Sequence, residues 1–220
     1  MKDVVLFGTG VFGRTVCREL AMASDYNVVA FTADREYCES NTYLDRPVVP
    51  FDEVASAYSP ADYVMFIALG YLSLNRLKSR KYAEAKAAGY TLISHVSARA
   101  VTWGELTVGD NCFVGPNTVV DSSATIGNDV FIGSNCVVPH DTRIGDHCFL
   151  GDGVLLGGYV SISEYCFLGT GSIVRNRVRV ARESVVGAGA LILQDTAEKS
   201  VHMGAAAEEL PISSDRLPPA

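Results

Sequence analysis

The chain is poor in positive charge and has no long apolar run. Its 220 residues carry 18 lysines and arginines against 25 aspartates and glutamates, a formal net charge of −7. Because a nucleic-acid backbone is bound by clustered Lys and Arg, this balance argues against a nucleic-acid partner. No stretch approaches the roughly 20 consecutive apolar residues of a membrane helix, and the charged Lys2-Asp3 start is not that of a signal peptide. We therefore expect a cytoplasmic protein with no membrane partner.

A six-residue period runs through the second half of the chain. Six matches neither the helical period of about 3.6 nor the strand period of about 2, so the repeat indicates a coil of short strands and turns. Glycine often follows the aliphatic residue, where it supplies the backbone freedom that corners need. The pattern predicts a parallel β-helix with a column of stacked aliphatics inside. The periodic residues are Val108, Val114, Val120, Ile126, Ile132, Val138, Ile144, Leu150, Leu156, Ile162, Leu168, Val174, Val180, Val186 and Ile192.

The six cysteines resemble a disulfide set by count alone, yet four of them share one repeat position. Cys112, Cys136, Cys148 and Cys166 each follow an aliphatic residue by four places. Other turns fill that position with small residues such as Ala, Ser, Thr or Val. We interpret these thiols as packing residues, and a metal site is the less favoured alternative.

The first ninety residues have a different pattern. Val4–Phe7 is typical of a buried strand, and it leads into the glycine-rich segment 8–13 and a helix from Arg14 to about Ala23. A second strand is expected from Asn27 to Thr32, ending near Asp34. Further along the chain, we expect a strand at 63–69 and a helix at 73–88. Alternating strands and helices predict a small parallel sheet of the Rossmann type.

These patterns divide the chain into an α/β N-terminal Rossmann-like domain at 1–94, a parallel β-helix at 95–210 and a tail at 211–220. The first segment holds only about four strands, fewer than two mononucleotide-binding halves require, but one half can hold one nucleotide. Gly8, Gly10 and Gly13 would present amide N–H groups to a phosphate, and Asp34 could accept from a ribose hydroxyl or a base N–H. Alternatively, the glycines only turn a corner beneath a helix, and Asp34 is a solvated turn residue.

The arrangement resembles the hexapeptide-repeat acyltransferases with a left-handed β-helix. Within them it is similar to the bacterial sugar acetyltransferases that modify nucleotide-linked amino sugars or sialic acid. The resemblance implies a nucleotide sugar on the N-terminal domain, a homotrimer, and acetyl-CoA in the groove between subunits. Tyr71 and Asn75, which follow the strand at 63–69, correspond to the loop that faces the nucleotide sugar in that family.

The same resemblance places the chemistry on His140. Family members have a general-base histidine at this place, usually with an acidic or second histidine neighbour, and Asp141 follows here. Imidazole is suited to removing an amine proton at neutral pH, and a carboxylate can orient it. His95 and His202 lie at the edges of the coil, and His147 follows an aspartate in an ordinary turn.

In the family that the chain resembles, main-chain groups of the turns after the catalytic histidine hold acetyl-CoA. By repeat register these turns correspond to Gly158, Thr170 and Ala188, and the Gly158 amide is the candidate oxyanion donor. We expect no metal, because a three-histidine zinc site would need more than His140 and His147 inside the repeat. The sequence therefore predicts an acetyl-CoA-dependent N-acetyltransferase of a nucleotide-linked amino sugar in surface-glycan biosynthesis (O-antigen, capsule or glycoprotein). The alternatives are an O-acetyltransferase acting on a sugar or sialic acid and a non-catalytic sugar-nucleotide-binding scaffold.

Overall fold

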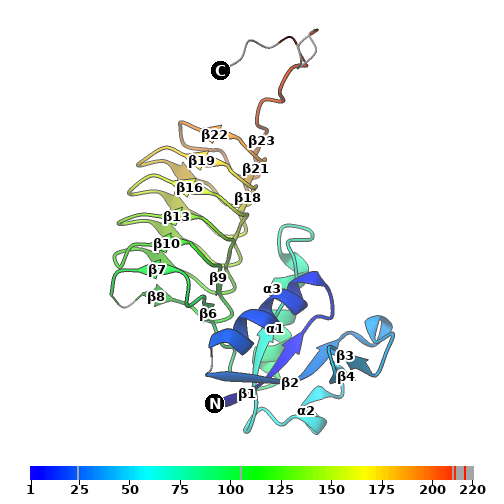
Figure 1. The fold of residues 1–220 in the computed structure, drawn as a ribbon. Coiled ribbons are helices and arrows are strands. Elements are labelled where there is room, and N and C mark those ends of the chain that lie inside the picture. The colour runs from blue at the N-terminus through cyan, green and yellow to red at the C-terminus, as the bar shows by residue number, and fades with distance from the viewer. Residues whose placement is uncertain (24, 105, 210, 212–215, 217–220) are drawn as a thin grey trace.

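The computed structural model describes residues 1–23, 25–104, 106–209, 211 and 216. An α/β unit at the N-terminal end lies beside a tall coil of short strands (Figure 1). The predicted fold class is confirmed: a small Rossmann-like sheet is followed by a left-handed parallel β-helix. Most of the predicted tail at 211–220 lies outside the described residues.

The N-terminal sheet has five strands in the order β3-β4-β2-β1-β5, and it differs from the prediction at one edge. β3 pairs antiparallel with β4, so the sheet is mixed. Leu44 and Asp45 between them both have positive φ, 49° and 59°, as in the tight turns that favour hairpins. The elements are β1 (Lys2–Phe7), α1 (Val11–Ala23), β2 (Tyr26–Ala33), η1 (Arg35–Tyr37), β3 (Thr42–Tyr43), β4 (Arg46–Pro50), α2 (Val54–Ala57), β5 (Val64–Ile67) and α3 (Arg76–Ala87).

Two helices begin at other residues than the sequence suggests. α1 begins at Val11, and the Arg14 amide donates to the Gly10 carbonyl at 3.1 Å, so the glycine-rich segment itself forms the first helical turn. α3 begins at Arg76 because the three residues before it, 73–75, all have positive φ. Their left-handed turn replaces the predicted first turn of the helix.

The coil has three parallel sheets, which we name by what their outer surfaces carry. Val119 pairs with Val137, eighteen residues on, so one coil takes eighteen residues. The docked face consists of β6 (His95–Val96), β9 (Phe113–Val114), β12 (Phe131–Ile132), β15 (Phe149–Leu150), β18 (Phe167–Leu168), β21 (Val185–Val186) and β23 (Val201–His202). The apolar face consists of β7 (Val101–Thr102), β10 (Val119–Val120), β13 (Val137–Val138), β16 (Leu155–Leu156), β19 (Ile173–Val174) and β22 (Leu191–Ile192). The polar face consists of β8 (Thr107–Val108), β11 (Thr125–Ile126), β14 (Arg143–Ile144), β17 (Ser161–Ile162) and β20 (Arg179–Val180).

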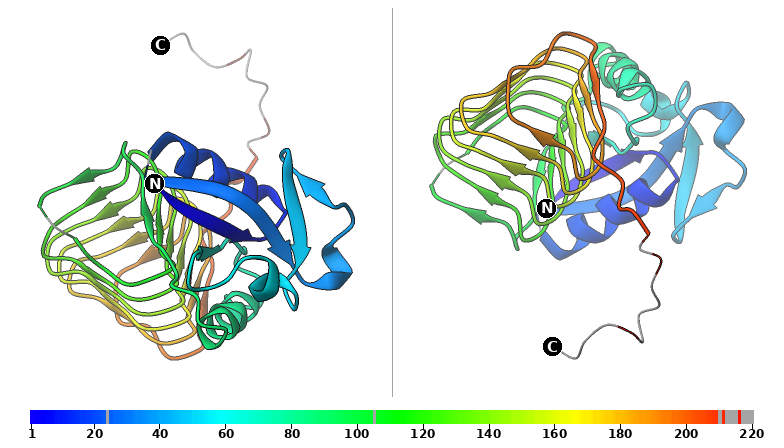
Figure 2. Two further views of the ribbon diagram at one scale, coloured as in Figure 1. Left: turned by 90° about the horizontal axis from the view of Figure 1, so that it is seen from below. Right: turned by 90° about the horizontal axis from the view of Figure 1, so that it is seen from above.

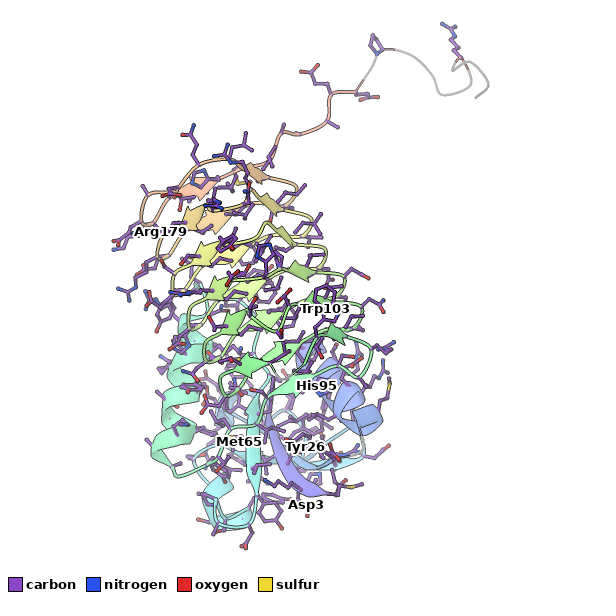
Figure 3. All side chains as sticks on the ribbon, turned by 90° about the vertical axis from the view of Figure 1, so that its left-hand side faces the viewer. Asp3, Tyr26, Met65, His95, Trp103 and Arg179 are labelled. Carbon is purple, nitrogen blue, oxygen red and sulfur yellow. The ribbon has the colours of Figure 1, made fainter. Side chains whose placement is uncertain are left out.

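The predicted aliphatic column fills the interior of the coil. Every periodic residue except Val108, which is partly buried, is buried, and the four repeat cysteines lie inside with them. Seen end-on, the turns lie over one another, with the N-terminal sheet to one side (Figure 2). Trp103 lies toward the N-terminal end of the coil and Arg179 toward the other end (Figure 3).

The outer surface of the docked face carries a stack of aromatic rings. Phe113, Phe131, Phe149 and Phe167 follow one another with ring centroids 4.4–5.4 Å apart. Phe12 of α1 meets the rings of Phe113 and Phe131 edge-on. The N-terminal unit therefore packs on the part of this face that carries the phenylalanines.

Candidate active site

His140 lies on the corner between the apolar and polar faces, in the turn that joins β13 to β14. Its Nδ1 is 3.2 Å from Oδ2 of Asp141, and both side chains are about half exposed, at 52% and 49%. If Nδ1 carries the proton that the carboxylate accepts, Nε2 is left with a free lone pair. We call this corner the dyad corner, because the pair has the arrangement that a general base requires.

The next coil shapes the space around the imidazole. A Cβ on Gly158 would lie 2.6 Å from Cε1 and Nε2 of His140, so only glycine leaves room for the ring. Tyr159 meets the imidazole edge-on at 5.0 Å, and the guanidinium of Arg177 lies 5.0 Å from the centroid of the tyrosine ring. A pocket of about 320 Å³ opens between Asp141, Arg143, Tyr159 and neighbouring residues of the polar face. A substrate can therefore reach the dyad from solvent.

The glycine-rich segment borders a second and larger pocket in the N-terminal unit. Gly8, Gly10 and Asp34 all line this space of about 770 Å³. Gly13 does not line the pocket, and a Cβ there would lie 2.1 Å from the Gly8 carbonyl oxygen. Gly13 thus allows α1 to pack directly on the loop, while Gly8 and Gly10 border the pocket.

An ion pair holds Asp34 at the edge of the larger pocket. Lys81 of α3 lies 2.6 Å from Oδ1 of Asp34 and 2.7 Å from a carboxylate oxygen of Glu84. Burial alone would lower the pKa of Lys81, but the hydrogen bonds and charges of the two carboxylates raise it. Lys81 therefore stays charged and occupies one oxygen of Asp34, which leaves the other for a ligand.

Tyr71 and Asn75 lie against the coil. The ring of Tyr71 is tilted against Phe149 and Phe167 at 5.0 and 4.9 Å, although half of the side chain is exposed. Asn75 is buried, and its Nδ2 donates to the backbone carbonyl of His147 at 2.7 Å. This contact favours a docking role for Asn75, whereas Tyr71 adjoins pocket-lining residues and can still meet a ligand.

Thr170 and Ala188 lie one above the other on the corner between the docked and apolar faces, which we call the third corner. Gly158 lies on the dyad corner. Within one chain the three predicted acetyl-CoA contacts therefore belong to two different corners, with the apolar face between them.

Sequence reasoning missed a second histidine–aspartate pair, on the corner between the polar and docked faces. Nδ1 of His147 is 2.8 Å from Oδ2 of Asp129, and Lys78 of α3 lies 3.0 Å from the other carboxylate oxygen. Asn111 also donates to Asp129, at 2.6 Å. Burial would raise the pKa of Asp129, but Lys78, His147 and Asn111 together lower it.

A spacing of eighteen residues is the signal that could have revealed this corner, which we call the docking corner. The residues that recur at this spacing on the corner all have positive φ, a conformation that Asn and Asp adopt more often than other residues with side chains. Arg76 of α3 extends the contact, lying over the Tyr165 ring at 3.8 Å and pairing with Glu183 at 2.8 Å. The column is Asn111, Asp129, His147, Tyr165 and Glu183.

Comparisons with known proteins agree with this architecture. The family described as bacterial transferase hexapeptide (six repeats) matches residues 123–158, and the hexapeptide repeat of succinyl-transferase matches 105–138 and 159–194. Perosamine N-acetyltransferase from Caulobacter crescentus, solved with CoA and GDP-perosamine, is 26% identical over 93% of this chain and 94% of its own, with a TM-score of 0.84. This chain carries hexapeptide repeats and is similar in fold and sequence to a sugar acetyltransferase built on them. Two structures of that relative carry a histidine replaced by Asn or Ala.

Other solved structures share this fold. The acetyltransferase domain of PglB from Neisseria gonorrhoeae is 23% identical over 96% of this chain and all of its own, with a TM-score of 0.83. WeeI from Acinetobacter baumannii is 20% identical over 87% of this chain and 94% of its own, with a TM-score of 0.66. No curated protein sequence matches.

Neither a candidate membrane helix nor a candidate metal-binding cluster is found among the described residues. There, no helix is long and apolar enough to cross a membrane. Among the same residues, no three His, Cys, Asp or Glu side chains are grouped so that they could hold a metal ion.

Proposed function

We propose that the protein transfers the acetyl group of acetyl-CoA to the amino group of a nucleotide-linked amino sugar, in the biosynthesis of a surface glycan. The observation that carries the proposal is the exposed His140–Asp141 pair on the corner of a hexapeptide-repeat coil, beside a glycine that makes room for the imidazole. The match to perosamine N-acetyltransferase, a protein solved with CoA and a GDP-linked sugar, supports the choice of substrates.

In this reaction the amine nitrogen attacks the thioester carbonyl carbon. Nε2 of His140 accepts the proton that the nitrogen loses, while Asp141 accepts the Nδ1–H and stabilises the imidazolium. When the tetrahedral intermediate collapses, the carbon–sulfur bond breaks and the imidazolium returns the proton to the thiolate. A backbone amide such as that of Gly158 stabilises the oxyanion in between.

We propose further that the enzyme is a homotrimer whose active site lies between subunits. The outer residues of the apolar face support this, because Val101, Leu155, Ile173 and Leu191 are 40–57% exposed. Exposed apolar columns of this length are typical of contact surfaces. The corresponding residues of the polar face are Thr107, Thr125, Arg143, Ser161 and Arg179.

A threefold ring built on the apolar face would join the separated parts of the site. The two edges of that face are the dyad corner and the third corner. In a heterologous ring, one edge of each subunit meets the opposite edge of the next. His140 and Gly158 of one subunit would then bind acetyl-CoA together with Thr170 and Ala188 of its neighbour. The N-terminal unit of that neighbour, packed on its docked face, would place a nucleotide-sugar pocket beside the same groove.

The function is tested by measuring CoA release from acetyl-CoA with GDP-, UDP- and dTDP-linked amino sugars and their hydroxyl analogues. The wild type and His140→Ala are assayed in parallel. Turnover on one amino sugar that is lost in the variant is the expected result. Turnover only on hydroxyl acceptors would mean that the enzyme is an O-acetyltransferase. If the folded protein turned over none of the acceptors, a non-catalytic sugar-nucleotide-binding scaffold would be favoured.

The shared site is tested by mixing two inactive subunits. Gly10 has open space around it, so Gly10→Asp places a carboxylate at the edge of the pocket, where it repels phosphate without a clash. Mixed trimers of His140→Ala and Gly10→Asp chains should recover about a quarter of wild-type activity, because that share of interfaces pairs an intact His140 with an intact pocket. A site within one subunit would give no recovery.

A further inference from the structure

The backbone hydrogen bonding of the coil follows one rule at its corners, and Asp141 departs from it. In the described coils from Asp129 to Gly189, each left-handed corner residue except Asp141 donates its backbone N–H to a carbonyl of the previous coil, nineteen residues earlier. Thus Tyr159 donates to the His140 carbonyl at 3.1 Å, and His147 to the Asn128 carbonyl at 2.8 Å. A backbone acceptor of this kind is present whatever the side chains are.

At Asp141 a side chain takes the place of that carbonyl. The Asp141 N–H donates to Oγ of Ser123 at 3.0 Å. Accepting this bond uses a lone pair of the serine oxygen, so the hydrogen of the hydroxyl remains free. It donates to Oδ1 of Asp121 at 2.9 Å. The Ser123 N–H donates to the same oxygen at 3.0 Å. The contacts form one chain from Asp121 through Ser123 to Asp141.

The charge of Asp121 supports this chain of contacts. The backbone and hydroxyl hydrogen bonds from Ser123, together with the nearby His140, lower the pKa of Asp121. The carboxylate is therefore ionised at neutral pH, and an ionised acceptor strengthens the hydrogen bonds that it receives. Ser123 is held in the orientation in which its oxygen faces the Asp141 amide.

The position of Asp141 explains why such an anchor matters. Its φ is 57°, a left-handed conformation that aspartate adopts more readily than most residues with side chains but that still depends on the contacts around it. The Asp141 carboxylate contacts Nδ1 of His140 in this conformation. If the amide lost its acceptor, the corner could relax and the carboxylate would leave the imidazole.

We propose that Ser123 is a positioning residue for the dyad, which it serves by holding Asp141, and that Asp121 holds Ser123. The proposal rests on the function proposed above for His140. Ser123 itself need not touch a substrate. Its effect should pass entirely through Asp141, which distinguishes it from a residue that only stabilises the coil.

A double-mutant cycle tests the proposal by kcat. Ser123→Ala should lower kcat about fivefold, the value of one ordinary hydrogen bond, and Ser123→Thr should restore it by returning the hydroxyl. In an Asp141→Asn background, Ser123→Ala should cause no further loss. The control is Ser163→Ala, at a corner that carries neither the dyad nor the predicted acetyl-CoA contacts. Wild-type kcat in Ser123→Ala, or an equal loss in both backgrounds, would overturn the proposal.

Chemical labelling of His140 separates this proposal from the proposed function. The rate of modification by diethyl pyrocarbonate is measured by mass spectrometry, with the peptide of His202 as the internal reference. Ser123→Ala should slow the labelling of His140 to the rate of Asp141→Asn. This result in an enzyme with no turnover on any acceptor would refute the function and keep the positioning role. A wild-type labelling rate in Ser123→Ala would refute the positioning role.

Discussion

The described residues form two histidine–aspartate pairs with similar contact distances and different surroundings. Nδ1 of His140 lies 3.2 Å from Asp141, and Nδ1 of His147 lies 2.8 Å from Asp129. The first pair is about half exposed on its corner, whereas His147 is 15% exposed and Asp129 is completely buried under α3. A contact between imidazole and carboxylate therefore does not identify a catalytic site by itself. The surroundings decide whether the pair can react or only hold two parts of the molecule together.

The largest expected effect comes from breaking the buried pair on the side of α3. Lys78→Met removes the cation and leaves the Asp129 carboxylate buried with too few partners. We expect the free energy of unfolding to fall by about 3–5 kcal/mol, measured by urea denaturation. Lys86→Met is the matched control on the same helix, because the pair of Lys86 with Asp110 is partly exposed and should contribute only about 0–1 kcal/mol. Equal losses in the two variants would contradict the role of the buried pair.

The exposed pair should respond to a change that leaves the fold almost intact. Gly158→Ala puts a Cβ 2.6 Å from the imidazole of His140, which is the end of a side chain that can turn away. We expect kcat to fall about a hundredfold, because a displacement of the general base by about 1 Å has an effect of this order. The unfolding midpoint should change little. A fully active Gly158→Ala enzyme would show that His140 does not react from its position beside Gly158.

The smallest effect concerns the pH dependence of stability. The pKa of Asp129 is lowered in the folded protein, so its contribution is complete above the pKa of the unfolded chain, about 3.9, and is lost as the pH falls through the folded value. Unfolding free energies of the wild type should therefore decrease below about pH 5. The double variant Lys78→Met, Asp129→Asn should have a flatter profile. If the free energies of unfolding of the two proteins fell in parallel at low pH, carboxylates other than Asp129 would account for the loss of stability in acid.

The regular parts of the molecule could be predicted from the sequence because they repeat. The aliphatic period gives the coil, and it also places His140 off the buried column, on a corner. The hairpin at Leu44 and Asp45 escaped prediction, since leucine is not a residue that such turns favour. The left-handed turn at 73–75, which delays α3, contains no glycine and gave no signal either.

The eighteen-residue spacing could have revealed the docking corner, but its burial could not be predicted because it depends on residues far apart in the chain. Lys78 contacts Asp129 across 51 residues, and Asn75 contacts His147 across 72. Nothing in the local sequence of His147 distinguishes it from a solvated turn residue. Only the packing of α3 against the coil buries its partner. The anchoring of Asp141 by Ser123 likewise becomes visible only once coils are stacked in register.

The most direct test of this account measures activity and stability together for His140→Ala and His147→Ala. We predict that His140→Ala loses roughly a hundredfold to ten-thousandfold in kcat, as expected for a general base, with an unchanged unfolding midpoint. His147→Ala should lose about 1–3 kcal/mol of stability, because Asp129 loses a buried partner, and should retain its activity while folded. An active His140→Ala enzyme, or a His147→Ala enzyme that is stable and inactive, would contradict the assignment of the two pairs.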